Sequence, residues 1–171
     1  MAERPKKMLF SIPSLDASCS CILLWDKAPK TVQAIVDEMP METICFHGRN
    51  SGDEGLLLMP KCISHLPQDA SENVQTEHVK GGIYFGYEPA GESYGGASPG
   101  NSCSEIAWFY GHAGQACMWK SEHGAPHDKP PFYREAVGLN LFAMVEEEIN
   151  FFAASCSLQR KGEQKIKVWV E

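Results

Sequence analysis

The residues of this 171-residue chain that best suit chemistry lie in one short stretch, Thr43–Leu58, where two apolar runs flank a polar segment. Arg49 stands in that segment, and its guanidinium group offers permanently charged N–H donors in a plane that fits a carbonyl or carboxylate group. His47 precedes it, and Asp53 and Glu54 follow it. The pattern predicts a site that orients a small acid or amide. The alternative is a solvent-exposed hairpin that carries one arginine.

A second set of polar side chains follows on a later predicted strand. Glu105 supplies a carboxylate that stays ionised beside an arginine and can accept a proton. His112 titrates near neutral pH and can act as an acid or a base. These residue types suit an isomerase or a hydrolase of a small acid, amide or lactam. The predicted catalytic residues are Arg49, Glu105 and His112, and the predicted substrate-binding residues are His47, Ser51, Glu54, Tyr84, Tyr94 and Tyr110.

Strands must position these side chains, and successive side chains on a strand point to opposite faces. This alternation puts His47 and Arg49 on one face of the first strand. On the later strand it puts Glu105 on one face and Tyr110 on the other. A charge among apolar strands must face an opening or a partner. We therefore predict that Arg49 and Glu105 reach one cavity, with Tyr110 or His112 on its wall; the alternative is a structural ion pair.

The first predicted helix spans residues 29–39. Pro29 suits the first position of a helix, and Pro40 ends it. Its apolar residues recur at helical spacing and predict one stripe that packs on the core. This stripe consists of Val32, Ile35, Val36 and Met39.

The second predicted helix spans residues 145–160. Glu146–Glu148 would occupy its first turn, and Arg160 and Lys161 its end, which is the order of charges that the helix dipole favours. Gly162 then provides a stop signal. The predicted buried stripe of this helix consists of Ile149, Phe152, Ala153 and Cys156.

The complete pattern predicts a mainly β protein in which about eight strands form a closed antiparallel barrel capped by two α-helices. Three polar segments, 59–80, 88–104 and 121–135, are predicted to be loops. The sequence shows neither a repeat nor an internal boundary. Residues 1–171 are therefore expected to form a single domain.

Short motifs resemble those of the cyclophilin-like fold. The run DKAPKT at 26–31 opens a helix, and FHGR at 46–49 follows on a strand. Later, EI at 105–106 and YG at 110–111 resemble a strand of a small uncharacterised cyclophilin-like family. The resemblance extends over residues 8–171 in the order of elements. It implies a cyclophilin-like β-barrel with two helices.

The resemblance also implies a second candidate activity, isomerisation of the peptide bond that precedes proline. In cyclophilins an arginine donates to the prolyl nitrogen and lowers a barrier of about 20 kcal/mol, and Arg49 could fill that role. The chain departs from the cyclophilin pattern, because Gly48 is inserted and Asn50–Glu54 replaces the expected Phe-Met-x-Gln-Gly-Gly run. A small-molecule site is therefore the preferred hypothesis. Prolyl isomerisation and a non-catalytic binding module are the alternatives.

Composition limits the partners. The 15 basic and 22 acidic residues give a formal net charge of −7, which argues against nucleic-acid and anionic-membrane partners. No apolar run approaches the roughly 18 residues of a membrane span, and residues 1–7 lack the apolar core of a signal peptide; we expect a cytoplasmic protein. The seven cysteines lack a framework spacing and are predicted to be reduced. The prediction includes a small-molecule ligand, no metal and no cofactor, and it leaves the oligomeric state open, a homodimer included.

Overall fold

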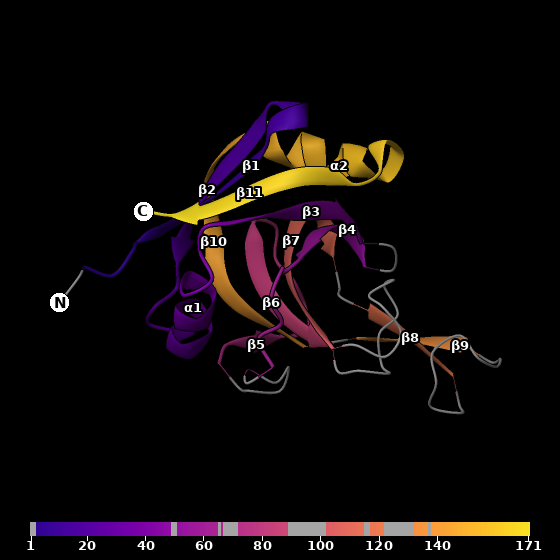
Figure 1. The fold of residues 1–171 in the computed structure, drawn as a ribbon. Coiled ribbons are helices and arrows are strands. Elements are labelled where there is room, and N and C mark those ends of the chain that lie inside the picture. Colours follow the sequence, from indigo (N-terminus) through magenta and orange to yellow (C-terminus); the bar gives the residue numbers. More distant parts are fainter. Residues whose placement is uncertain are drawn as a thin grey trace.

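The chain forms a closed antiparallel β-barrel in a computed structural model (Figure 1). Its eight strands are β1 (Lys7–Ile12), β2 (Ala17–Leu23), β3 (Met41–His47), β4 (Gly52–Leu58), β6 (Gly82–Glu88), β7 (Cys103–Gly114), β10 (Leu139–Ile149) and β11 (Gln164–Val170). They follow the order β2-β1-β11-β3-β4-β7-β6-β10, and the pairing of β10 with β2 closes the barrel. The structure describes residues 3–48, 51–64, 66, 72–88, 102–114, 117–121, 132–136 and 138–171.

Two α-helices, α1 (Pro29–Val36) and α2 (Phe151–Lys161), accompany the barrel, and Figure 1 shows them well apart from each other. A mainly β protein with a closed barrel and two helices is the predicted fold class, which is thereby confirmed. The shorter elements are a 3-10 helix, η1 (Pro13–Leu15), a strand that pairs with β10, β5 (Val74–Gln75), and a separate two-stranded sheet of β8 (Cys117–Ser121) and β9 (Phe132–Ala136).

The interior of the barrel is one apolar cluster to which all eight strands and both helices contribute. Its composition follows from strand alternation: buried and partly exposed side chains alternate along the whole of β1 and β2. On β7, Ile106 and Trp108 belong to this interior cluster. Ala107 and Phe109, which alternate with them, belong to a second cluster on the outer face of the barrel, together with Tyr84. The predicted division of β7 into two faces is therefore confirmed.

The second helix differs from its prediction. β10 continues as a strand through Glu146–Glu148 to Ile149, and α2 begins only at Phe151. The strand continues because Glu147, Glu148 and Ile149 pair with β2, and such a long-range partner is invisible in the local charge pattern. The buried stripe of α2 therefore differs from the predicted one. Ile149 belongs to the strand and is 66% exposed, and Ala153 and Cys156 of the helix are exposed as well. The buried residues of α2 are Phe151, Ala154, Ser155 and Leu158.

The first helix agrees with its prediction at its start, since it begins at Pro29. It ends at Val36, three residues earlier than predicted. Val32 and Ile35 are buried, while Val36 and Met39 are partly buried and pack against the interior cluster.

The side chains of six of the seven cysteines are described, and all six are free thiols. Cys19 and Cys21 share the inward face of β2, but their Sγ atoms are 3.9 Å apart, well beyond the roughly 2.05 Å of a disulfide bond. No helix in the described part of the chain has the length and the apolar character needed to cross a membrane. The described residues also contain no group of three or more side chains placed to hold a metal ion.

Candidate functional site

Three polar side chains from three distant elements meet at the α2 end of the barrel. His47 Nε2 lies 2.7 Å from the hydroxyl oxygen of Tyr110. Gln159 Nε2 lies 3.0 Å from the same imidazole nitrogen and 3.5 Å from the tyrosine oxygen. Tyr110 is 8% exposed, His47 is half-buried and Gln159 is exposed. The group is therefore buried on the barrel side and open to solvent on the helix side.

Strand register and one buried tryptophan position this group. His47, the last residue of β3, pairs with Gly55 of β4, and Gly55 pairs with Trp108 of β7. The indole of Trp108 occupies the space above Gly55, where a Cβ atom would overlap it. Trp108 Nε1 donates a 2.8 Å hydrogen bond to Ser155 Oγ of α2. Gln159 follows Ser155 by four residues and so lies on the same side of the helix.

Burial sets the protonation states of the pair. Burial lowers the pKa of His47, although a hydrogen bond with the Gly48 backbone and the negative charge of Asp53 act in the opposite direction. Burial raises the pKa of Tyr110 to about 12, and its neighbours Cys156 and Asp53 add to the effect. Near pH 7 the imidazole is therefore neutral and the phenol keeps its proton. The Tyr110 hydroxyl then donates its hydrogen bond to His47 Nε2.

One carboxylate, that of Asp53, acts electrostatically on both members of this pair, and glycines make room for it and for the neighbouring Glu54. Asp53 lies over Gly111, and Glu54 lies against Gly48; a Cβ atom on either glycine would overlap the carboxylate. Glu54 is only 4% exposed. The backbone N–H of Gly48 donates a 2.9 Å hydrogen bond to the carbonyl oxygen of Glu54, which holds the end of β3 against β4. The Asp53 charge is therefore fixed near both members of the His–Tyr pair.

The structure brings together only some of the predicted site residues. His47 and Tyr110 are in contact, and buried Ser51 and Glu54 lie at the start of β4 beside the end of β3. Glu105 is on the outer face of β7, five residues or about 17 Å along the strand from Tyr110. Structure and prediction agree that these two side chains occupy opposite faces.

The remaining predicted residues divide into two groups. Tyr84 is fully buried in the outer cluster, where its hydroxyl accepts a 3.0 Å hydrogen bond from the Val79 N–H, and His112 is exposed near the end of β7. Arg49 and Tyr94 lie outside the described residues. The predicted cavity shared by Arg49 and Glu105 therefore remains a prediction.

Sequence reasoning missed Gln159 and gave Cys156 only a place in the core. Cys156 is in fact exposed, and it helps to raise the pKa of Tyr110. A polar residue near the end of an amphipathic helix carries no local signal of a site. Only the position of α2 over the end of β3 and β7 reveals the contact.

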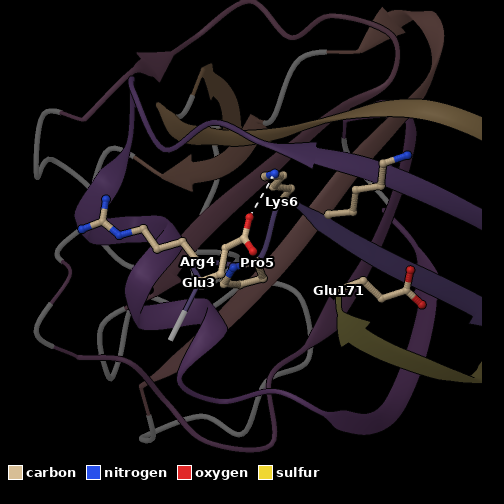
Figure 2. A pocket seen from close by; sticks show the side chains of 6 residues that line it. Glu3, Arg4, Pro5, Lys6 and Glu171 are labelled. Carbon is tan, nitrogen blue, oxygen red and sulfur yellow. Dashed lines mark ion pairs between the residues drawn. The ribbon is translucent and has the colours of Figure 1, made fainter. Parts of the chain in front are cut away.

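The described surface cavities are elsewhere. Two shallow cavities of about 360 Å³ each adjoin the N-terminal segment. Figure 2 shows the one whose walls are Glu3–Lys7 and Glu171, with an ion pair between Lys6 and Glu3 at 3.1 Å. The other includes Arg4, whose guanidinium group lies 4.9 Å from the centre of the Trp25 ring. In the first cavity Lys6 pairs with Glu3 and Lys7 with Glu146.

The protonation of His47 can be measured directly. We expect its imidazole to titrate below pH 6.5 because the ring is partly removed from water. Asp53→Asn should lower the His47 pKa further, since it removes a negative charge that favours the protonated ring. Imidazole ¹H–¹⁵N spectra recorded against pH give both midpoints. A wild-type midpoint above 6.5, or a higher midpoint in Asp53→Asn, would contradict the described electrostatics.

Comparisons with known proteins identify a family but no activity. A family model described as a protein of unknown function (DUF3830) matches residues 10–124, and no curated protein matches the sequence. The solution structure of the hypothetical protein AF2241 from Archaeoglobus fulgidus is similar over 100% of both chains, with 20% identity and a TM-score of 0.53. A structure of McbB in complex with tryptophan is similar over 95% of this chain and 44% of that chain, with 12% identity and a TM-score of 0.60.

At these identities the two structures establish the fold alone. The closed barrel that the sequence resemblance implied is confirmed. The narrower resemblance to cyclophilins is not confirmed and remains a prediction.

Proposed function

Because this chain belongs to the DUF3830 family, whose members are described only as proteins of unknown function, we propose a function from the site itself. The protein binds a small carboxylic acid at the α2 end of the barrel and transfers a proton on it, as an isomerase. His47 is the general base, and Tyr110 is the hydrogen-bond donor to the reacting oxygen. Arg49, two residues after His47, binds the carboxylate.

The 2.7 Å contact between His47 Nε2 and the Tyr110 hydroxyl carries this proposal. Burial keeps the imidazole neutral and therefore able to accept a proton near pH 7. Burial keeps the phenol protonated and therefore able to donate a hydrogen bond. One base and one donor, held side by side at a solvent-accessible position, are the parts that a proton-transfer reaction needs.

The reaction follows from these two states. His47 Nε2 removes a proton from the carbon next to the substrate's carbonyl group. The electron pair of the C–H bond forms a C=C bond, and the π pair of the C=O bond moves onto the carbonyl oxygen. The Tyr110 O–H and the Gln159 amide donate hydrogen bonds to that oxygen and stabilise its charge. The protonated imidazole then returns the proton to a different atom of the same molecule. Nothing is oxidised or reduced, and the product is an isomer of the substrate.

Two further observations fit a small acid. The side chain of Gln159 is exposed, so a ligand can reach the pair from the α2 side. The McbB structure, which shares the fold, contains tryptophan in complex with the protein, and tryptophan is itself a small molecule with a carboxylate. That likeness covers less than half of McbB. It therefore indicates only the size of a ligand found with a protein that contains this fold, and it gives no position for a ligand in this chain.

Deuterium exchange tests the proposal. An enzyme that removes a proton next to a carbonyl group should exchange that proton with solvent in D2O. We expect the wild type to accelerate exchange in at least one of pyruvate, 2-oxobutyrate and 2-oxoglutarate, followed by ¹H NMR. His47→Gln should lower the accelerated rate by about 100-fold or more, and Tyr110→Phe by about 10-fold or more. Lys27→Gln, an exposed change away from the site, should match the wild type.

The outcomes separate the hypotheses. No acceleration with any of the three acids, or full activity in His47→Gln, would refute the proposed reaction. Saturable binding of an acid without exchange would instead support a binding module. In prolyl isomerisation the essential donor is an arginine, so a proline-peptide assay in which His47→Gln is fully active would favour that alternative.

A further inference from the structure

A second polar group, the side-chain amide of Asn140, is buried in the barrel with no hydrogen-bond partner among the described residues. Its side chain is 0% exposed. Among the described residues neither its Oδ1 nor its Nδ2 atom has a hydrogen-bond partner. Buried amides in folded proteins are almost always bonded, because losing the hydrogen bonds with water costs free energy that only a new partner restores. The function proposed above makes no use of this residue.

The side chain of Asn140 points toward the interior of the barrel. Leu139 and Leu141, its neighbours on β10, both belong to the outer apolar cluster. Because side chains alternate along a strand, Asn140 faces the opposite side. It pairs across the sheet with Phe85 of β6, whose ring belongs to the interior cluster, and with Val74 of β5. An unpaired amide therefore stands in the apolar interior at the end of the barrel where β5 joins.

This position is separate from the His47–Tyr110 pair. Phe85 pairs with Ile106 of β7, and Tyr110 lies four residues further along that strand. At about 3.3 Å per residue the separation along β7 alone is about 13 Å. Between the height of Asn140 and that of Tyr110, Ile106 and Trp108 fill the interior face of β7. A ligand at Asn140 would therefore not touch the imidazole.

We propose that the barrel interior around Asn140 binds a small uncharged molecule that presents a hydrogen-bond donor beside an acceptor, as a primary amide does. An asparagine side chain has both functions on one planar group, so it can make two parallel hydrogen bonds with another amide. The apolar surroundings strengthen those bonds and exclude an ionised carboxylate, whose desolvation would cost too much. The site requires no contribution from His47 or Tyr110.

Acetamide and acetone test this recognition, because they have nearly the same shape but only acetamide has N–H donors. In ¹⁵N-labelled wild-type protein we expect acetamide to shift the side-chain NH2 signals of Asn140 in a saturable manner. Acetone should act at least roughly tenfold more weakly, as expected when one hydrogen bond is lost. Absence of a saturable shift with acetamide, or equal responses to the two molecules, would overturn the proposal.

Asn140→Leu is the matched variant, since leucine has a similar volume and no polar atoms. It should lose the acetamide response at the backbone signals of Phe85 and Val74, and it should melt at a higher temperature than the wild type. An undiminished acetamide response in this variant would overturn the proposal. If the variant does not fold, the comparison of the two probes on the wild type still decides. A crystal structure with only a water molecule on both amide atoms, even after soaking with acetamide, would also refute it.

Discussion

Replacing Trp108 with alanine should lower the free energy of unfolding by about 3–5 kcal/mol, the usual cost of removing a large aromatic side chain from a core. Trp108 is 0% exposed and packs against Phe10 and Phe151, with ring centroids 6.2 and 5.3 Å away. Its indole also donates the hydrogen bond to Ser155 that fixes α2 to β7. Because small domains have only about 5–15 kcal/mol of stability, this loss should be evident in urea unfolding.

Two matched changes separate the contributions of Trp108. Trp169→Ala removes the same type of side chain from a half-exposed position on β11 and should cost less than half as much. Ser155→Ala keeps the indole but leaves its buried N–H without a partner, at a cost of about 1–3 kcal/mol. It should also weaken the binding of a ligand that contacts Gln159, because Ser155 and Gln159 lie on the same helix. Equal losses for Trp108→Ala and Trp169→Ala would contradict the described core.

Acidification should destabilise the protein by about 2–3 kcal/mol through one residue, His78. Its ring stacks on Phe109, with centroids 4.5 Å apart and an interplanar angle of 7°, and meets the edge of Tyr84, also at 4.5 Å. Burial lowers the pKa of His78 from 6.5 to about 4. In the unfolded chain the ring takes up its proton near pH 6.5. The unfolded state therefore binds more protons than the native state between these two values, and stability falls as the pH falls from about 6.5 to about 4.

The magnitude follows from the gap between the two pKa values at about 1.4 kcal/mol per unit, reduced somewhat because a charged imidazole still interacts with an aromatic face. Urea unfolding at pH 7 and at pH 4 measures it. His78→Gln should remove about 2–3 kcal/mol of the difference between the two pH values. Val79→Ala, an exposed change at the next residue, should preserve that difference. An unaltered pH dependence in His78→Gln would show that other groups dominate the acid response.

The sequence by itself determined the faces of the strands. The alternation along β7 predicted that Glu105 and Tyr110 lie on opposite faces, and the residues between them divide in the same way, with Ile106 and Trp108 in the interior cluster and Ala107 and Phe109 in the outer one. Such predictions succeed because the period of a strand is fixed by backbone geometry and needs no knowledge of the partner strands. The start of α1 at Pro29 was predictable for a similar local reason, the fixed φ angle of proline.

Only the tertiary structure decided which side chains meet. His47 and Tyr110 are 63 residues apart in sequence, and Gln159 is 112 residues from His47. Their contact depends on the register of β3, β4 and β7 and on the place where α2 crosses the barrel. The same dependence explains the error at Glu146–Glu148, whose local charges indicated a helix although pairing with β2 holds them in a strand. Pairing between distant segments is a cooperative choice of the whole chain, and no single segment encodes it.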